Sequence, residues 1–575
     1  MGAGPAGALE PFEDGADASV ESVDAGVGDF LQEVRVAVAR SAARTPVKMR
    51  SGVGSFMSIR NECLSFECPC TAARGGKRQD WKHVFDGDDT DLGLQARMES
   101  KSAGVSPNQL MDSRFDLQVN KKALQINLDP RIYGTFAEIG AGQEVARRFF
   151  HVGGAAGTIA KTMSAYDMTF SDSIYGSSGR YVSRERLSKM LEHEYSLLEE
   201  RLAAKVGDQR TFFVLANTVA ARSFRRHDES HGWMGIRFQT SPRAPASDII
   251  IHVRMLDALN IQQQEALGII GVNLIYAAFH HSNRPETLIA SLLDDLSSAR
   301  MEVDMIRFSG PDFLAVDNRL MSLQLVAQGL TKAAMFRADG DVVQAAEAFY
   351  KKSILVERGS FRPVTHVTND MLDCARSMFA AQDHVEESNL EVLMEITMQN
   401  LLSGGRLDLH DFLDRIDLLA ALGRTVLISN YGEYHRLVQF LTRYTDLSVS
   451  LALGAPSLDE IFDEQYYSNL EGGILEGLGR LFKAGVRLYV YPRLESDGSV
   501  TTAETFQVAP HLRHLYRHLL ENGHVVGMDG YNPSYLSIKS ADVLAKIRQK
   551  SDGWQEMVPP EVATIIRDRR LFAIN

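Results

Sequence analysis

Beyond about residue 117, short apolar runs alternate with stretches in which apolar residues recur every three to four positions. This alternation predicts β-strands interleaved with amphipathic helices. The clearest helix runs from Ser183 to Val206: Ser183 is a suitable N-cap, and Glu185 in the first turn suits the helix dipole. The short apolar runs predict buried strands at Thr211–Leu215, Asp248–Met255, Met301–Phe308, Ile354–Arg358, Thr425–Ser429, Leu447–Leu453 and Val486–Tyr491.

Other segments have less distinct patterns. We expect a helix at Gln262–Ile270 followed by a strand at Val272–Ala278, and a helix over Leu320–Phe336. Residues 363–367 are expected to form a short strand, and residues 369–402 a helical region. Tyr133–Glu138 is a poor strand candidate.

Strands alternating with helices, many of the strands wholly apolar, predict an α/β fold of layered, largely parallel sheets flanked by helices. The expected organisation is two α/β units. Residues 1–116 form a flexible N-terminal extension, 117–368 the first unit, 369–402 a helical connector, and 403–575 the second unit with a helical tail.

Composition narrows the function. The chain has 575 residues, 45% of them hydrophobic and 23% charged, with a net charge of −13. That balance is ordinary for a globular protein and argues against broad nucleic-acid binding, which needs a basic surface. The longest apolar run, Ala266–Phe279, is too short to span a bilayer. Four cysteines suit a reducing, intracellular compartment without disulfides.

The first sixty residues change charge sign. Residues 1–33 contain acidic side chains and no Lys or Arg, whereas residues 34–60 contain Lys and Arg and no acid. Two interpretations stay open for residues 34–60: a flexible extension, which we favour, or an organelle-targeting segment. The expected location is therefore cytoplasmic, or organellar if this segment acts in targeting.

Two glycine clusters in Phe136–Thr162 suggest an anion site. Backbone amides at glycine-rich turns and helix starts attract phosphate. The Rossmann fingerprint fails at Val145, and the Walker spacing fails at Thr158. The alternative is that the glycines permit tight turns and close packing. Candidate ligand-binding residues are Gly140, Gly142, Gly153, Gly154, Gly157, Thr158 and Lys161, with Arg147 or Arg148 as further counter-charges.

Positions after the predicted strands are a second source of candidates, because ligands gather beyond the carboxyl ends of parallel strands. Arg358, Ser360 and Arg362 form a compact basic loop suited to a carboxylate or phosphate. The competing interpretation is turn chemistry with surface ion pairs. Further polar residues at such positions are Asn217, Thr218, Ser309, Asp317, Arg319, Ser429, Asn430 and Ser457.

We expect no metal site. His227 and His231 lack the glutamate of a zinc-protease helix, and a loop before the strand Trp233–Phe238 is expected there. His511, His514 and His518 share one helical stripe, but such histidines more often border a buried face. No nucleophile elbow is visible, so catalytic residues and cofactor stay unassigned.

From about Ala123 onward, the chain resembles a family of bacterial and algal proteins of unknown biochemistry. The resemblance includes EIGAGQEVARRFFHVGGAAGTIAKT, HGWMGIRFQT, KKSILVERGSFRPVT, GRTVLISNYGEYHRL and NLEGGILEGLGRLF. Members are often labelled nicotinate-nucleotide adenylyltransferase or TonB-dependent receptor. The H-x-G-H motif of the former and the secretory signal and barrel strands of the latter are absent from this sequence.

Together these features predict an intracellular enzyme or enzyme-like binder of a nucleotide or another small phosphorylated metabolite, at best of the transferase class. The alternative is a non-catalytic scaffold or assembly protein. A homo-oligomer is compatible with both.

Overall fold

The computed structural model describes residues 118–222, 230–382, 384–402 and 405–572. All of them belong to one compact unit, Lys101–Asn575. The acidic and basic N-terminal segments, His227 and three of the four cysteines lie outside the described residues. No helix among those described is long and apolar enough to cross a membrane.

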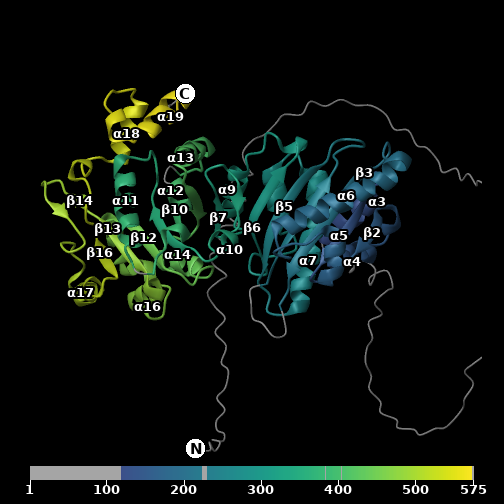
Figure 1. Ribbon diagram of the computed structural model, residues 1–575, viewed down its shortest axis with the longest axis horizontal. Helices are drawn as coiled ribbons and strands as arrows, with labels where there is room; N and C mark the ends of the chain where they lie inside the picture. The colour runs from purple at the N-terminus through teal and green to yellow at the C-terminus, as the bar shows by residue number, and fades with distance from the viewer. Residues whose placement is uncertain (1–117, 223–229, 383, 403–404, 573–575) are drawn as a thin grey trace, which may run out of the picture. The chain divides into compact units, whose positions relative to one another are not determined.

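A six-stranded sheet is built from the first half of the described chain (Figure 1). Its order is β2-β1-β3-β4-β5-β6. Strands β2, β1 and β3 are parallel, and β3 to β6 continue antiparallel. The bounds are β1 (Ile132–Ile139), β2 (Ile159–Met163), β3 (Thr211–Ala220), β4 (His231–Phe238), β5 (Ser247–Met255) and β6 (Met301–Ser309).

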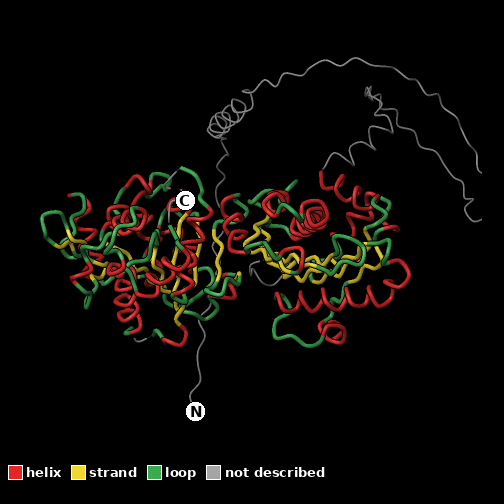
Figure 2. Tube along the Cα trace, turned by 90° about the horizontal axis from the view of Figure 1, so that it is seen from above, coloured by secondary structure: helices red, strands yellow, loops and turns green. Residues whose placement is uncertain are grey.

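Helices cover both faces of this sheet, as the view in Figure 2 shows. One core cluster joins β-strands to helices that include α4 and α7, and the other joins them to α6. Apolar side chains are therefore buried on both faces of the central strands, which explains the apolar runs Thr211–Leu215 in β3 and Ile249–Ile251 in β5. The helices are α3 (Gln118–Leu128), α4 (Glu144–Val152), α5 (Met168–Tyr175), α6 (Arg184–Val206), α7 (Asn260–His281) and α8 (Pro285–Ser291).

An eight-stranded sheet follows, in the order β16-β13-β12-β9-β10-β11-β7-β8. Its strands from β16 to β11 are parallel, and β7 and β8 add an antiparallel edge. The bounds are β7 (Ala333–Phe336), β8 (Val342–Val343), β9 (Ser353–Arg358), β10 (Leu390–Thr397), β11 (Thr425–Ser429), β12 (Val449–Gly454), β13 (Arg487–Tyr491) and β16 (Val525–Gly527).

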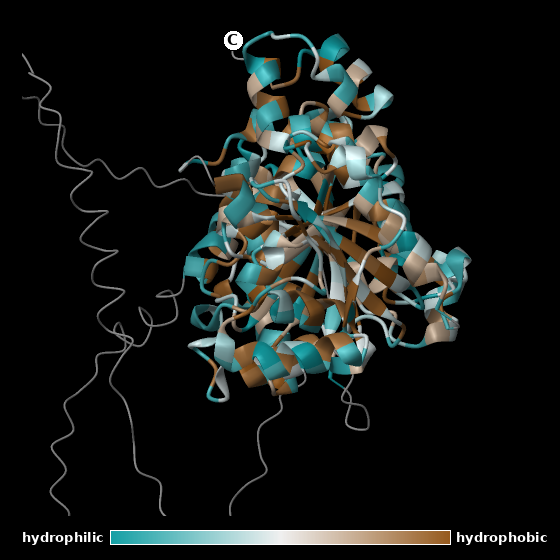
Figure 3. Cartoon of the chain, turned by 90° about the vertical axis from the view of Figure 1, so that its left-hand side faces the viewer, coloured by the Kyte–Doolittle hydropathy of each residue, from teal (hydrophilic) through white to brown (hydrophobic). Residues whose placement is uncertain are grey.

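This sheet also lies between two apolar layers, and its hydrophobic strands are visible inside more polar helices in Figure 3. A small hairpin, β14 (Arg493–Leu494) with β15 (Val500–Thr501), stands apart from it. The helices are α9 (Asn318–Ala327), α10 (Ala345–Ala348), α11 (His366–Ala380), α12 (Met398–Leu402), α13 (Leu409–Ala421), α14 (Tyr434–Leu441), α15 (Pro456–Ile461), α16 (Gly473–Leu481), α17 (Arg513–Glu521), α18 (Ser540–Arg548) and α19 (Pro560–Arg569).

The predicted α/β class is confirmed, and four local predictions are wrong. The strand expected at Val272–Ala278 belongs to the long helix α7, whose middle is buried on nearly all sides and so lacks a one-sided pattern. The end of the helix expected at Leu320–Phe336 is strand β7. The expected strand at residues 363–367 is a loop that enters α11. Residues 369–402 are not continuously helical, because β10 lies among them and pairs with β9 and β11.

Tyr133–Glu138, a poor strand candidate by sequence, lies in strand β1, which pairs with both β2 and β3. Gly134 weakens its strand pattern, but a Cβ at this position would lie 2.4 Å from the Phe213 backbone oxygen and ring. The glycine is thus needed for close packing rather than for a turn.

Candidate functional site

The first glycine pair forms the turn between β1 and α4. Gly140 has a φ of +103°, and a Cβ there would lie 1.9 Å from the Val219 carbonyl oxygen. Gly142 has a φ of +85°. The turn lies at the carboxyl ends of β1 and β3, where a ligand site is expected in such a sheet.

The chain itself supplies an anion to this helix start. Glu138, 1% exposed, accepts hydrogen bonds from the Val145 amide at 3.1 Å and the Ala146 amide at 2.9 Å. Asn217 Nδ2 donates to the same carboxylate at 3.1 Å. Burial raises the pKa of Glu138 to about 7, against the opposing effect of these donors. The amides expected to attract phosphate at α4 therefore bind an internal carboxylate.

The second glycine cluster lies at the other end of α4, before β2. The amides of Gly153, Gly157 and Thr158 donate to backbone carbonyls of Phe150, Gly154 and Ala155 at 3.0–3.3 Å. Nine helical residues separate the clusters, about 13 Å at the usual rise. Gly140 and Gly142 therefore do not share one site with Gly153, Gly154, Gly157 and Thr158. Phosphate binding by the second cluster stays a prediction, although three of its amides already have backbone acceptors.

Lys161 lies on β2 and is neutralised. Its Nζ forms an ion pair with Glu194 of α6, which is 1% exposed. Tyr175 also donates its hydroxyl to Glu194, at 2.8 Å. Burial and the carboxylate raise the pKa of Tyr175 well above its usual range. The expected further counter-charges pair locally, Arg147 with Glu144 at 2.8 Å and Arg148 with Glu265 at 3.8 Å.

The second sheet has a topological crossover. Strands β9, β10 and β11 progress in one direction, and the chain then returns past β9 to add β12, β13 and β16 on its other side. The connections after β9 and β12 thus leave the sheet in opposite directions. In open α/β sheets, a crevice at this position outside the carboxyl ends is the general ligand site.

Arg358 ends β9 at this crossover. Its Nε and Nη2 donate to Glu395 of β10 at 2.8 and 3.0 Å, and its Nη groups also donate to the carbonyls of Tyr431 and Gly432. Its guanidinium carbon lies 4.1 Å from the centre of the Tyr434 ring. Burial opposes its charge, but Glu395 holds the Arg358 pKa above the usual value.

The loop after Arg358 is anchored by a second ion pair. Arg362 Nε donates to Asp411 at 2.5 Å, and Asp411 also binds the buried Arg415. Arg415 in turn donates to the Ser360 carbonyl at 3.1 Å. Arg362 is the more accessible of the two predicted arginines, with 27% of its side chain exposed against 8% for Arg358.

Connections from three strands meet at this edge. Ser429, which ends β11, donates its hydroxyl to Glu395 at 2.5 Å. Tyr434 at the start of α14 lies near Ser457, which follows β12. Arg358, Ser429 and Ser457 are candidates by sequence, whereas Glu395 is not, because the helical pattern expected over residues 369–402 hides the strand that carries it. We name this group, Arg358 to Arg362 with Glu395, Ser429, Tyr434 and Ser457, the crossover edge.

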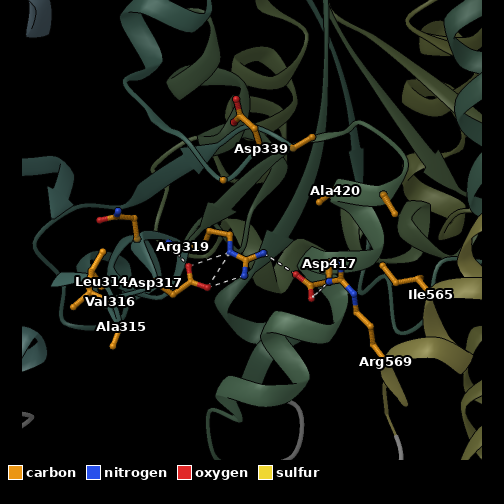
Figure 4. A pocket seen from close by; sticks show the side chains of 14 residues that line it. Leu314, Ala315, Val316, Asp317, Arg319, Asp339, Asp417, Ala420, Ile565 and Arg569 are labelled. Carbon is orange, nitrogen blue, oxygen red and sulfur yellow. Dashed lines mark hydrogen bonds and ion pairs between the residues drawn. The ribbon is translucent and has the colours of Figure 1, made fainter. Parts of the chain in front are cut away.

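A cleft of about 760 Å³ borders two other residues noted in the sequence, Asp317 and Arg319 (Figure 4). Arg319 donates to Asp317 at 2.6 Å and to Asp417 at 2.7 Å. Arg569 donates to Asp417 at 2.7 Å. Burial opposes ionisation of Asp317, but Arg319 holds its pKa below the usual value. With Asp339 also in the lining, carboxylates exceed guanidinium groups, so this cleft is poorly suited to an anion.

Comparisons with known proteins give little functional information. No protein-family model and no curated protein matches the chain. The competence/damage-inducible protein CihA from Agrobacterium tumefaciens is 15% identical over 28% of this chain and 94% of that chain, with a TM-score of 0.22. A competence or damage-inducible protein from Enterobacter asburiae is 14% identical over 28% of this chain and 96% of that chain, with a TM-score of 0.21. Similarity at this level supports no assignment of a site.

Proposed function

We propose that the protein binds a nucleotide or another small phosphorylated metabolite at the crossover edge. The observation that carries this proposal is the strand order of the second sheet, whose direction reverses between β9 and β12. The connections after these two strands diverge, and in open α/β sheets this is the position where backbone amides and loop side chains meet a ligand.

Arg362 and the start of α11 are the proposed anion-binding elements. Arg362 is accessible, and the loop it belongs to leads into a helix of fifteen residues. The dipole of such a helix favours a phosphate at its N-terminus, where the Thr365 side chain accepts from one first-turn amide, that of Thr368. Arg358 is proposed to hold the connection after β11 through its bonds to Tyr431 and Gly432, rather than to bind the ligand. The transferase class stays a prediction, since no group here is assigned to bond making.

Thermal unfolding with added ligands tests the proposal. Adenosine triphosphate, nicotinamide mononucleotide and glucose 6-phosphate are the probes, because they share a phosphate and differ in the rest of the molecule. A ligand at a hundred times its Kd stabilises the folded state by about 2.7 kcal/mol. Arg362→Ala should abolish the shift. Arg376→Ala, which removes an exposed arginine from α11, should leave it unchanged.

Lys161→Ala separates the two sheets as ligand sites. A shift lost with Lys161→Ala and kept with Arg362→Ala would place the ligand on the first sheet and overturn the proposal. No shift with any of the three phosphorylated probes would also contradict it.

A scaffold or assembly role is the second candidate, favoured by a separate observation. Tyr166, Met168 and Phe170, at the start of α5, are 73%, 60% and 60% exposed. Large apolar side chains gathered on a surface often mark a protein contact. Light scattering of the purified chain tests this: a stable oligomer that Phe170→Ser dissociates would support assembly, and a monomer at all concentrations would contradict self-association.

A further inference from the structure

The first sheet, which is not part of the proposed ligand site, has an irregularity between β5 and β6. His252 pairs with Met305, and Val253 pairs with Val303, so Asp304 is an extra residue opposite this step. Such a β-bulge turns a side chain to the other face of the sheet, and bulges are frequent beside active sites.

The bulge places Asp304 and Met305 on one face. Met305 belongs to the apolar cluster that includes Trp233 and Leu187, whereas Val303 and Ile306 belong to the cluster on the opposite face. Without the extra residue, strict alternation would direct the Asp304 and Met305 side chains to opposite faces. The result is a carboxylate, 9% exposed, directed at His252.

Three side chains form a continuous chain of hydrogen bonds. His252 Nδ1 lies 2.6 Å from Asp304 Oδ1, and His252 Nε2 lies 3.0 Å from His231 Nδ1. Gln344 donates to the other oxygen of Asp304 at 3.3 Å. His231 and His252 are diagonal neighbours on β4 and β5, since His231 pairs with Arg254 and Trp233 with His252.

With His252 neutral, these contacts define the tautomers. An ionised Asp304 only accepts, so His252 Nδ1 carries the proton and donates it. His252 Nε2 is then the acceptor for His231 Nδ1–H, which leaves the lone pair of His231 on Nε2. Burial opposes ionisation of Asp304, but His252 holds its pKa below the usual value. Burial and the neighbouring His252 lower the pKa of His231 to about 4, so this imidazole is neutral at pH 7.

The three hydrogen-bonded side chains extend from the buried core toward the surface, which is unusual for a purely structural feature. His252 is 1% exposed and packs edge-on against Trp233, at 4.9 Å between ring centres. His231, by contrast, is only partly buried. The charged groups that influence it electrostatically are Asp304, Arg254 and Arg180, and Arg254 forms an ion pair with Glu302 at 2.6 Å. Hydrogen-bonded side chains therefore connect a buried carboxylate to a partly buried imidazole near Arg180 and the Arg254–Glu302 ion pair.

We propose that Asp304, His252 and His231 form a proton relay, in which His231 Nε2 accepts a proton from an O–H group of an anionic ligand. The O–H bond of the ligand breaks, and its electron pair stays on the oxygen. The new N–H bond forms at His231 Nε2, the Nδ1 proton passes to His252 Nε2, and the positive charge then lies beside Asp304. Arg180 supplies the positive charge that favours an anion, whereas the charge of Arg254 is offset by Glu302, and Asp304 and His252 act as positioning residues.

Nuclear magnetic resonance of ¹⁵N-labelled imidazoles in the full-length protein tests the relay. In the wild type, we expect His231 to carry its proton on Nδ1. Asp304→Asn offers a donor to His252 Nδ1 and should reverse both tautomers, which places a proton on His231 Nε2. Asp341→Asn is the matched control, because it removes a nearby carboxylate that pairs with Arg184 and Arg307 instead. A wild-type His231 protonated on Nε2 would overturn the proposal even if the variant does not fold.

Reactivity provides a second readout. Diethyl pyrocarbonate acylates an imidazole lone pair, and peptide mapping reports the rate at His231. We expect Asp304→Asn to slow this reaction by at least about tenfold, by analogy with the wrong-tautomer effect in catalytic triads. An unchanged rate in a variant that keeps the wild-type melting temperature would contradict the relay.

Inorganic phosphate, which carries an ionisable O–H near neutral pH, is the probe for the ligand class. Millimolar phosphate should shift the His231 resonances at pH 7, with the shift weakened by Arg180→Ala and kept in Arg201→Ala, an exposed control on α6. If chloride shifts the His231 resonances as much as phosphate does, the ligand need not donate a proton, and the proposed ligand class would be wrong.

Discussion

Replacement of Glu138 by Gln tests how the turn after β1 is stabilised. Burial raises the pKa of this carboxyl from 4.5 to about 7 in the folded protein. Between pH 4.5 and about pH 7, Glu138 is therefore protonated to a greater extent in the folded protein than in the unfolded chain. Stability is highest below the unfolded pKa and falls as the pH rises through the folded pKa. A shift of this size corresponds to about 3 kcal/mol.

Glutamine does not titrate, so the difference between the two proteins isolates this effect. From pH 4.5 to pH 8, the free energy of unfolding of the wild type should fall by about 3 kcal/mol relative to Glu138→Gln. Urea unfolding followed by the fluorescence of Trp233 reports the first sheet, provided that Trp81 and Trp554 are replaced by Phe in both proteins.

Glu471→Gln removes the same formal charge from an exposed position and serves as the control. A wild-type minus Glu138→Gln difference that is constant with pH would refute the reasoning. A difference that rises with pH would show that the amides of Val145 and Ala146 outweigh the cost of burial.

Three further predictions concern the predicted ligand residues and the cleft. Gly140→Ala should destabilise the protein by about 3 kcal/mol in urea unfolding, because the new Cβ would overlap the Val219 carbonyl. Gly157→Ala is the control: no atom lies within 4 Å of its Cβ, so the free energy of unfolding should change by less than about 0.5 kcal/mol. Equal losses in the two variants would contradict this prediction. Arg358→Ala should cost about 3–5 kcal/mol, since Glu395 is fully buried, and a double-mutant cycle with Glu395→Ala should recover part of the loss. In the cleft, Arg569→Ala should cost less than about 1 kcal/mol because Arg569 is 57% exposed. Arg319→Ala should lower the melting temperature more, because Asp317 loses the guanidinium that pairs with it and Asp417 keeps only Arg569.

The local prediction succeeded where an element has a one-sided or an uninterrupted apolar pattern of suitable length. Helix α6 begins where Ser183 is expected to cap it, and the Ser183 hydroxyl accepts a hydrogen bond from the Arg186 amide at 3.2 Å. Strands β9 and β11 have nearly the expected bounds. The prediction failed in α7, whose buried middle lacks a polar face, and in β1, where Gly134 fits against Phe213.

The predicted ligand residues show a different limit. The sequence predicts basic and polar residues at the carboxyl ends of β9, β11 and β12, and the structure brings these strand ends to one edge of the sheet. The sequence does not predict which side chains pair with these residues. Glu138, Glu194 and Glu395 neutralise or replace charges that the sequence offered to a ligand. Whether a lysine or arginine is available depends on contacts between residues far apart in the chain.

The sequence by itself determined the α/β class, because periodicity and turn residues act over a few positions and are independent of distant partners. Only the tertiary structure decided the strand order, the bulge at Asp304 and the pairing of each charge. These depend on which distant segments meet and on which side chains become buried together, and neither is encoded in a local pattern.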